Sequence, residues 1–323
     1  MTTTSFDAIV IGAGPAGLTA GIYLARAKVK TLIINEGSVG GQLVLTHEIA
    51  NYPGVELTSG YQLATVMKKQ ARSFGCEIRA NVSVTRMDLT GDVKVIEVNG
   101  KEVFTAPAVI LAPGGRSRML GVPGEADLRG KGVSYCATCD GDFFQDKDIV
   151  VVGGGNSALE EAVSLTKYAR SVLIVHQFDH FQAFPHAVQE AERNPKIRFR
   201  MESKIVRFVG EESLERVTIE HQPTGEMTEV SVDGAFVFIG YVPNTESLAG
   251  QVVLNGSGEI VVSQSLETSL SGVFAAGDSI AKRYRQITTA VADGTIAALS
   301  AVEYLRMKQF TMADDVHQDA LVS

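Results

Sequence analysis

Residues 6–17 read FDAIVIGAGPAG, an apolar run followed at once by glycines in the spacing G-x-G-x-x-G. The run is typical of a buried strand, and a helical pattern, LTAGIYLARAK, and a second apolar run, KTLIINE, come next. This order is the setting in which such a turn binds a dinucleotide. Gly12 would permit the tight turn, Gly14 would let the backbone approach a pyrophosphate, and Gly17 would let the helix pack on the strand.

An acidic residue, Glu36, closes the second apolar run. It lies about 20 residues beyond the turn, where a carboxylate that binds a ribose is expected. The helix N-terminus at the turn would offer N–H groups to the pyrophosphate. The alternative is a glycine-rich turn that serves only the fold. Strand, helix and Glu36 together favour the dinucleotide site.

The same pattern occurs a second time. DIVVV at 148–152 leads into GGGNSA at 153–158, a helical stretch and the run SVLIVH, at an offset of 153 − 12 = 141 residues. Alternating apolar and polar residues, typical of antiparallel strands, follow each copy at 82–105 and 204–233. We therefore expect an α/β protein with two dinucleotide-binding (Rossmann-like, three-layer) domains.

A third strand-and-glycine signal, GVFAAGD at 272–278, indicates how the two domains are connected. The helical stretch after it, about 286–306, has no strand unit of its own left to pack on, so it is expected to complete the first domain. The second domain is then inserted into the first. The expected bounds are 1–117 and 246–323 for the first domain, and 118–245 for the second.

The composition of the 323 residues excludes several classes of partner. The charge is 29 − 37 = −8, which argues against binding to nucleic acid and against docking on an anionic membrane. No apolar run reaches the ~18 residues needed to span a bilayer, so no membrane insertion is expected. The N-terminal residues lack the features of a signal peptide, which predicts a cytoplasmic protein.

Two of the three cysteines form the motif CATCD at 136–140. In a cytosolic protein, Cys136 and Cys139 at this spacing are a redox-active pair or half of a metal site. A structural zinc site needs four ligands, and the sequence has no second CxxC, so no metal is expected. Asp140, next to the second thiol, is a candidate proton carrier. The third cysteine, Cys76, is expected in the core.

Several motifs run in one order that closely resembles the low-molecular-weight thioredoxin reductases, the class II pyridine nucleotide-disulfide oxidoreductases. The resemblance covers about residues 5–308. The motifs are GAGPAG at 12–17, GGQL at 40–43, NYPG at 51–54, SYCATCDG at 134–141, GGGNSALEEA at 153–162, IGYVPNT at 239–245, GVFAAGD at 272–278 and YRQ at 284–286.

The resemblance implies FAD on the first domain, NADPH on the second, a homodimer and domain rotation during turnover. It implies a Cys136–Cys139 disulfide facing the flavin, with Cys139 nearer the flavin and Cys136 attacking a thioredoxin-like disulfide protein. Asp140 would handle the proton, completing the catalytic set. The helix beginning near Gln286 would point its positive end at the flavin. The FAD-binding residues that it implies are Gly12, Gly14, Pro15, Ala16, Gly17, Glu36, Gly41, Gln42, Asn51, Gly277, Asp278, Arg285 and Gln286.

The second domain departs from the family pattern. Family members that use NADPH carry HRRxxxR after the second strand, whereas 176–182 here read HQFDHFQ. No Lys or Arg lies between Arg170 and Arg193, so nothing is provided for a 2′-phosphate. His176 and Gln177 stand where an NAD site would want a carboxylate. The sequence therefore predicts that NADPH is an unlikely donor. The donor would be a ferredoxin, another small redox protein or a second dinucleotide, such as a second FAD on Gly153–Ala158.

The resulting expectation is an FAD-dependent disulfide oxidoreductase of the thioredoxin reductase type with a donor other than NADPH. The alternatives are an ordinary NADPH-dependent reductase and a flavin-binding redox sensor that does not turn over. Asp278 has the alternative role of capping a helix. Asp142 replaces an aromatic residue just beyond the CxxC, which leaves the partner open. The C-terminal residues 311–323 are expected to be a frayed polar tail or to fold over the flavin face through His317.

Overall fold

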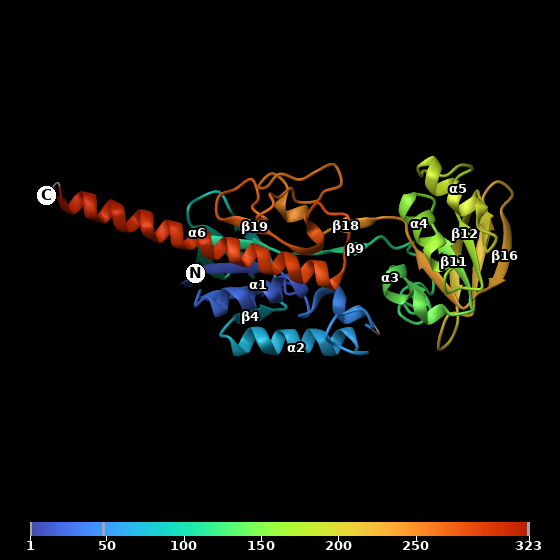
Figure 1. Cartoon of the computed structure of the whole chain (residues 1–323), viewed down its shortest axis with the longest axis horizontal. Helices are drawn as coiled ribbons and strands as arrows, with labels where there is room; N and C mark the ends of the chain where they lie inside the picture. Colours follow the sequence, from blue (N-terminus) through green and yellow to red (C-terminus); the bar gives the residue numbers. More distant parts are fainter. Residues whose placement is uncertain (1, 47–48, 322–323) are drawn as a thin grey trace. The chain divides into compact units, whose positions relative to one another are not determined.

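The computed structural model describes residues 2–46 and 49–321, without the side chains of Thr2, Leu45 and 309–321. The chain forms two compact units (Figure 1). One unit consists of Met1–Arg116 with Val242–Ser323, and the other of Ser117–Tyr241. The bounds expected from the sequence lie within a few residues of these. The chain passes between the units along β9 (Gly115–Ser117) and β18 (Tyr241–Pro243), which pair with each other.

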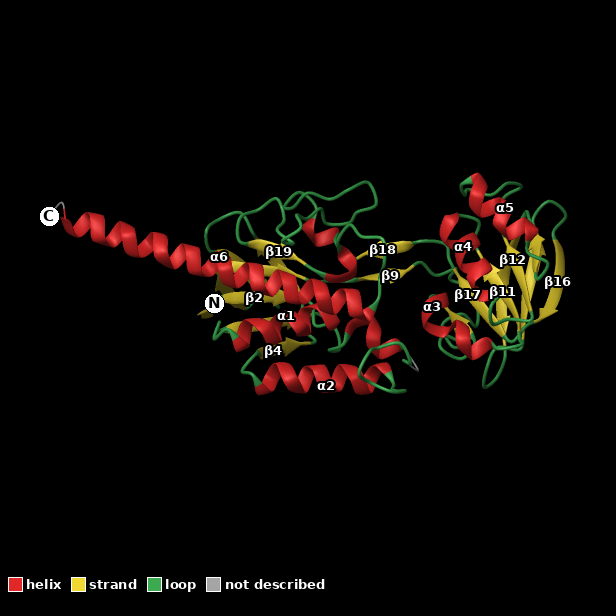
Figure 2. Ribbon diagram, viewed as in Figure 1, coloured by secondary structure: helices red, strands yellow, loops and turns green. Residues whose placement is uncertain are grey.

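The first unit combines two sheets with three long helices (Figure 2). Its elements in chain order are β1 (Thr2–Ser5), β2 (Ala8–Ile11), α1 (Pro15–Arg26), β3 (Thr31–Asn35), η1 (Gly41–Leu45), α2 (Gly60–Ser73), β4 (Glu77–Ala80), β5 (Val84–Asp88), β6 (Lys94–Val98), β7 (Glu102–Ala106), β8 (Ala108–Leu111), η3 (Glu246–Leu248), β19 (Val273–Ala275), η4 (Gly277–Ser279) and α6 (Ile287–Leu321).

The main sheet of the first unit is parallel, in the strand order β19-β8-β2-β3-β4. Its central strands are apolar along their whole length, because a parallel sheet is covered on both faces. Ile9 and Val10 of β2 are fully buried. Helix α1 packs against both α2 and α6, so the last helix of the chain lies beside the first. The expectation that the late segment completes the first domain is confirmed.

The second unit repeats this plan with a smaller second sheet. Its elements are β10 (Val133–Ser134), α3 (Ala137–Asp140), η2 (Gly141–Phe144), β11 (Asp148–Val152), α4 (Asn156–Leu165), β12 (Ser171–Val175), α5 (Pro185–Arg193), β13 (Ile197–Arg200), β14 (Ser203–Val209), β15 (Arg216–His221), β16 (Glu226–Ser231) and β17 (Gly234–Val237). The parallel sheet has the order β10-β17-β11-β12-β13, and β14-β15-β16 form an antiparallel meander.

The α/β class, the duplicated unit and both meanders are thus confirmed. The polar stretch TTTS at the start of the chain was not expected to be a strand, yet β1 pairs in parallel with β7. Threonine favours extended backbone, and β7 supplies the hydrogen-bonding edge. Helix α6 is also longer than expected, because its backbone continues to Leu321. The contacts expected of the C-terminal tail, including those of His317, lie outside the described residues.

Candidate functional site

The first glycine turn is built as the spacing predicts. Gly12 has φ +103°, and a Cβ there would lie 2.1 Å from the carbonyl oxygen of Ala112. A Cβ on Gly17 would lie 2.0 Å from the carbonyl oxygen of Gly12. Only glycine fits at both positions, because the helix approaches the strand at backbone distance.

The next glycine of the turn faces open space. Gly14 is the N-cap of α1 and makes no side-chain capping bond. A Cβ placed on Gly14 would find no atom within 4 Å. Pro15 and Ala16 start the helix, whose first N–H groups carry the positive end of the helix dipole. This turn therefore fits the pyrophosphate of a dinucleotide such as FAD.

Segments far apart in the sequence meet at this turn. The Gly40 N–H donates to the carbonyl oxygen of Ala13 at 2.8 Å, and a Cβ on Gly41 would lie 3.3 Å from the Cα of Gly14. On the other side, a Cβ on Gly277 would lie 2.9 Å from the Cβ of Ala16. The fold thus brings Gly41 and Gly277 to the first turn.

Three further residues expected at the flavin site lie near the ends of other elements. Glu36 is exposed directly after β3, and its Oε1 accepts the Val84 N–H at 3.3 Å. Gln42 on η1 and Asn51 in the loop beyond it are exposed as well. The three side chains are accessible to a ligand.

A partly buried cluster of charged side chains surrounds Asp278, which lies in η4 just after β19. Its Oδ1 is buried without a hydrogen-bond partner, although Lys282 Nζ lies 3.6 Å away as an ion pair. Burial raises the pKa of Asp278, and the cations Lys282 and Arg285 oppose this rise. A buried carboxylate oxygen that lacks a donor fits a ligand hydroxyl, as in the polyol chain of FAD.

Sequence reasoning missed the outer members of this cluster. Asp293 accepts a hydrogen bond from Lys282 Nζ at 2.5 Å and another from the Gly277 N–H at 3.2 Å. Arg285 pairs with Glu259, and its Nε donates to the Asp278 carbonyl at 3.4 Å. No spacing in the sequence announces this cluster, because residues 280–286 form no helix that would bring position 282 beside Asp278.

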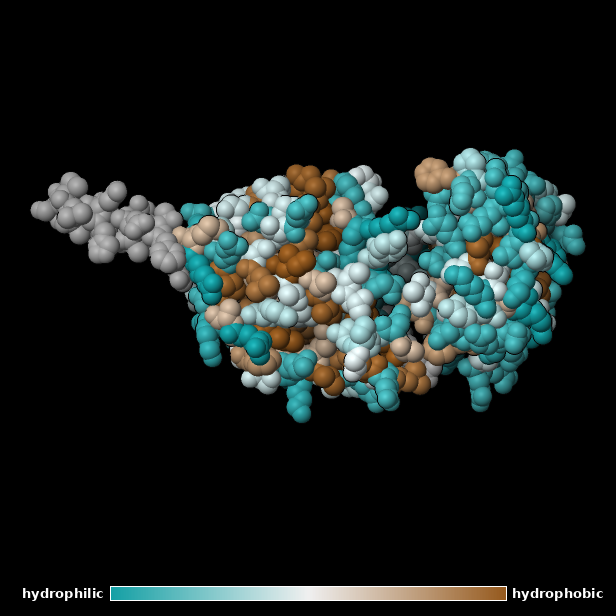
Figure 3. All heavy atoms as spheres, viewed as in Figure 1, coloured by the Kyte–Doolittle hydropathy of each residue, from teal (hydrophilic) through white to brown (hydrophobic). Residues whose placement is uncertain are grey.

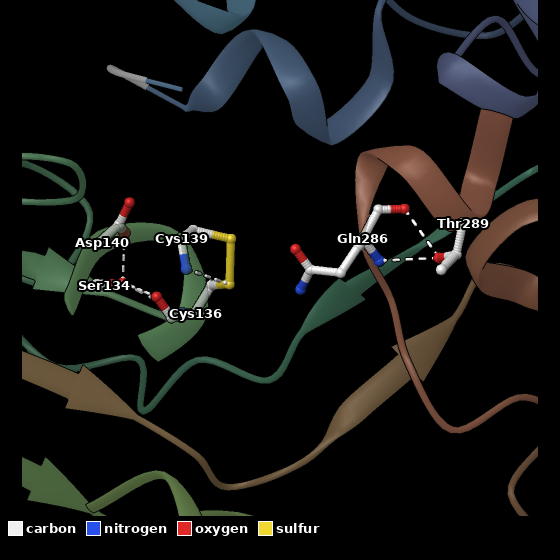
Figure 4. Close-up of a disulfide and its surroundings, with 6 residues drawn as sticks. All are labelled: Ser134, Cys136, Cys139, Asp140, Gln286 and Thr289. Carbon is white, nitrogen blue, oxygen red and sulfur yellow. Dashed lines mark hydrogen bonds between the residues drawn. A yellow bond between two sulfur atoms is a disulfide. The ribbon is translucent and has the colours of Figure 1, made fainter. Parts of the chain in front are cut away.

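Helix α6 starts where the sequence predicted, with Gln286 directly before its first residue. The backbone N–H of Gln286 donates to Thr289 Oγ1 at 3.1 Å, and this hydroxyl donates to the Gln286 carbonyl at 3.0 Å (Figure 4). The threonine hydroxyl therefore holds the start of the helix, while the Gln286 side chain extends away from it.

In the second unit, the two cysteines of the CATCD motif form a disulfide at the start of α3 (Figure 4). Their Cα atoms are 5.3 Å apart. The Cys139 N–H donates to the sulfur of Cys136 at 3.2 Å, which would also stabilise a thiolate there. Cys76 is a buried free thiol in the first unit, as expected. Burial raises the pKa of Cys76 to about 11, so it stays protonated.

The carboxyl group of Asp140 is held by a residue that the sequence reasoning did not single out. Ser134 Oγ donates to Asp140 Oδ2 at 2.5 Å. The pKa of Asp140 is raised by burial, lowered by this hydrogen bond and raised by the negative charge of Asp142. Asp140 is therefore able to take up a proton closer to neutral pH than an ordinary aspartate.

The middle glycine of the second turn, Gly154, packs against a side chain of the chain itself. His176 follows β12 directly, and a Cβ on Gly154 would lie 2.4 Å from its imidazole ring. His176 as a residue is 5% exposed, Phe181 stacks on its ring, and its Nε2 lies 3.1 Å from the His180 carbonyl oxygen. Burial lowers the pKa of His176, which favours the neutral ring.

The segment that follows the second strand and lies against this turn brings no cation, since residues 171–192 contain no Lys or Arg. Gln182 pairs with the turn, its N–H donating to the Gly154 carbonyl at 2.8 Å. Arg200, near in space, is the register partner of Val175. It therefore lies on the opposite face of the sheet from His176, because successive strand residues alternate.

Among the described residues, no group of three or more His, Cys, Asp or Glu side chains could hold a metal ion. The described helices also include none that is long and apolar enough to cross a membrane.

Comparisons with known proteins agree with this geometry. The sequence profile of the pyridine nucleotide-disulphide oxidoreductase family matches residues 6–294. The chain is 45% identical over 307 residues to the thioredoxin reductase of Peptoclostridium acidaminophilum, covering 93% of this chain and 97% of that protein. It is 44% identical over 299 residues to the "34.2 kDa protein in rubredoxin operon" of Clostridium pasteurianum, with the same two coverages.

A solved structure is similar over its whole length and over almost the whole of this chain. The thioredoxin reductase of Streptococcus pyogenes MGAS5005 matches with a TM-score of 0.90 at 38% identity, covering 95% of this chain and 100% of that chain.

Proposed function

Since the chain belongs to the pyridine nucleotide-disulphide oxidoreductase family and is a flavin-dependent disulfide oxidoreductase of the thioredoxin reductase type, we propose that its electron donor is not NADPH. Bound FAD supplies the electron pair that reduces the Cys136–Cys139 disulfide. The resulting dithiol passes the electrons to a protein disulfide such as that of thioredoxin. The relatives named thioredoxin reductase support this acceptor.

The observation that carries the proposal is the packing of His176 against Gly154. The 2′-phosphate of NADPH carries close to two negative charges and would meet Asp179 there, with no Lys or Arg from 171 to 192. Hydrogen bonds to charged groups are worth ~1.5–3 kcal/mol each. The absence of two or three arginine contacts would therefore weaken the binding of NADPH by several powers of ten, because each factor of ten in affinity corresponds to about 1.4 kcal/mol.

NADH escapes the phosphate penalty but finds no ribose carboxylate. In the first unit the residue after the second strand is the exposed Glu36, and in the second unit it is the buried His176. We therefore extend the proposal to NADH as a poor donor. A ferredoxin or another small redox protein is the donor that we favour, and the relative named for its rubredoxin operon supports this class. A second dinucleotide on Gly153–Ala158 is the other candidate.

The FAD site that we propose joins the first turn, Glu36, Gly41, Gln42 and Asn51 with Gly277, Asp278, Arg285 and Gln286. The open N-terminus of α1 would hold the pyrophosphate, and Asp278 would accept a hydroxyl of the polyol chain. The start of α6 at Gln286 would present its positive end to the ring system.

The chain's own residues account for the disulfide exchange. In the dithiol form, the Asp140 carboxylate takes the proton of the Cys136 thiol, and the thiolate bonds to one sulfur of the partner disulfide. The partner's S–S bond breaks, and its leaving sulfur receives that proton. Cys139 then attacks the Cys136 sulfur, its proton passing to the second partner sulfur as that sulfur leaves. Cys136 and Cys139 are thereby oxidised by two electrons, and the partner is reduced to a dithiol.

An anaerobic titration of the purified holoenzyme tests the donor. We expect slow or no bleaching of the flavin with micromolar NADPH or NADH, and prompt bleaching with dithionite or reduced ferredoxin. Rapid stoichiometric bleaching by NADPH would contradict the proposal and indicate an ordinary NADPH-dependent reductase. A protein that takes up no FAD would overturn the flavin site itself. If the flavin is reduced but no protein disulfide is reduced afterwards, the result would favour the redox sensor.

Cysteine variants test the route of the electrons. Cys136→Ser and Cys139→Ser should each abolish reduction of thioredoxin while FAD stays bound, because the dithiol no longer forms. Cys76→Ala is the matched control, since Cys76 lies buried in the first unit. A Cys136→Ser protein that still reduces thioredoxin would contradict the assignment.

A homodimer is the assembly that we propose. Figure 3 shows apolar side chains spread more widely over the unit that carries α6 than over the other unit. Tyr61 and Val66 of α2 and Leu299 of α6 are large apolar residues that are more than half exposed. Sedimentation equilibrium of the wild type and of Leu299→Glu tests this: a dimer that dissociates in the variant supports it, and a wild-type monomer contradicts it.

A further inference from the structure

Ser134 lies at the point where the redox-active disulfide and the proton-handling carboxyl group meet. It is the last residue of β10, two residues before Cys136, and only 6% of it is exposed. Figure 4 shows its side chain between the backbone of Cys136 and the carboxyl group of Asp140. Because Ser134 belongs to a strand, its backbone is fixed, and this limits the positions that its hydroxyl can take.

The Ser134 hydroxyl both donates and accepts a hydrogen bond. It donates to Asp140 Oδ2 at 2.5 Å and accepts the N–H of Cys136 at 3.1 Å. The Cys136 carbonyl oxygen, 3.4 Å away, is a second and more distant acceptor. One atom thus connects the backbone of the attacking cysteine to the carboxyl group that handles its proton.

We propose that Ser134 is a positioning residue for disulfide exchange, which holds the Asp140 carboxyl group and the Cys136 backbone in one geometry. The proposal rests on the proposed function, in which Asp140 takes the proton of Cys136 and gives it to the leaving sulfur. Ser134 itself neither takes up nor releases a proton in this sequence.

The hydroxyl also sets the pH range in which Asp140 works. Burial and the charge of Asp142 raise the pKa of Asp140, and the hydrogen bond from Ser134 lowers it. Among the described elements, those that pack most closely on α3 are η2, with Asp142, and α4, with Glu160 and Glu161. These groups are acids and do not favour a second negative charge nearby, whereas the hydrogen bond from Ser134 favours the ionised form of Asp140.

The test follows a single turnover of the prereduced holoenzyme with a small aromatic disulfide, 5,5′-dithiobis(2-nitrobenzoate), as a function of pH. The enzyme is reduced with dithiothreitol and desalted anaerobically, so the natural donor does not enter the measurement. We expect Ser134→Ala to move the inflection that belongs to Asp140 upward by about one pH unit. Exchange below that inflection should be about tenfold slower, and Ser134→Thr should restore the wild-type profile.

Two further variants complete the design. Ser134→Ala should shift nothing further in an Asp140→Asn background, because its effect passes through Asp140. The matched control is Ser203→Ala, which removes another buried serine hydroxyl of the second unit, one that donates to the Met201 carbonyl at 2.8 Å. It should leave the pH profile unchanged.

The outcomes separate the two proposals. If Asp140→Asn removes the inflection while Ser134→Ala leaves it in place, Ser134 is only structural and the inference is wrong. The same holds if Ser134→Ala slows exchange equally at every pH. If Asp140→Asn leaves the profile unchanged, the proton role of Asp140 fails, and the role of Ser134 fails with it. The donor titration is affected by none of these results.

Discussion

The two glycine turns are alike in backbone and different in what fills them. Gly12 and Gly153 both have positive φ, +103° and +139°. A Cβ on either would strike the carbonyl oxygen of the residue after a central strand, Ala112 at 2.1 Å and Phe238 at 2.4 Å. The turn and the neighbouring strand end thus approach each other about equally closely in both units, which the fold requires whether or not a ligand binds.

The difference lies in the residue that follows the second strand. In the first unit this residue is Glu36, which is exposed, and the space beside Gly14 is open. In the second unit it is His176, which is buried against Gly154, and the segment through Gln182 pairs with the turn. A Cβ on Gly155, which matches Gly14, would meet only the carbonyl oxygen of Gln182, at 3.9 Å. The comparison teaches that a glycine motif identifies a fold, whereas the side chain at the adjacent strand end decides which groups a ligand at the turn would meet.

The largest expected effect tests what the two turns share. Gly12→Ala should lower the free energy of unfolding by about 3 kcal/mol or more, because the methyl group meets backbone at a positive φ. The protein that does fold should lose its flavin. Gly153→Ala should be destabilised to a similar extent while its folded fraction keeps the flavin. Urea unfolding and the visible flavin absorbance per protein measure both, and a stable yellow Gly12→Ala protein would refute the comparison.

The next effect tests whether the open turn binds the dinucleotide. Gly14→Ala should leave the unfolding of the apoprotein almost unchanged, because its φ is −77° and no atom lies within 4 Å of the new methyl group. Its Kd for FAD should rise at least about tenfold, equivalent to about 1.4 kcal/mol, since the methyl group points into the ligand space. Gly155→Ala, at the matching N-cap, should not change FAD affinity. Equal FAD affinities for Gly14→Ala and the wild type would contradict this.

The strand-end residues should behave in opposite ways. His176→Ala should lower the free energy of unfolding by about 1–3 kcal/mol, because it leaves a cavity at Gly154, and it should not lower the affinity for FAD. Glu36→Ala should lower the affinity for FAD. It should change the free energy of unfolding by no more than about 0.5 kcal/mol, because Glu36 is exposed. Flavin titration and urea unfolding of both variants check this. The contrast between the turns is lost if Glu36→Ala destabilises and His176→Ala does not.

The smallest effect concerns pH. Because burial lowers the pKa of His176, the unfolded chain takes up a proton at higher pH than the folded protein does. The stability linked to this ring is complete above its ordinary pKa of about 6.5 and is lost as the pH falls through that value toward the lower folded one. His176→Gln should therefore lose less stability than the wild type between pH 7.5 and 5, by about 1 kcal/mol. Parallel urea midpoints for the two proteins across this range would argue against a buried neutral ring.

Much of the fold could be predicted because its signals are local. The strands at 8–11 and 148–152, the turns after them and the meanders each depend on residues close together in the chain. β1 was missed because its polar threonines carry no apolar signal and its partner β7 lies about a hundred residues away. The end of α6 was placed too early, since nothing in the acidic tail forbids a helix.

The candidate site also has features that local sequence predicts and features that depend on tertiary contacts. The sequence by itself determined the dinucleotide folds, the paired cysteines and the residues that resemble a flavin site, because each depends on a short spacing or on a residue type that only one geometry permits. Only the tertiary structure placed His176 in the space beside Gly154, Ser134 on Asp140 and Lys282 between Asp278 and Asp293. Those contacts depend on burial and on ångström distances between separate elements, and a one-dimensional pattern of residue types does not carry that information.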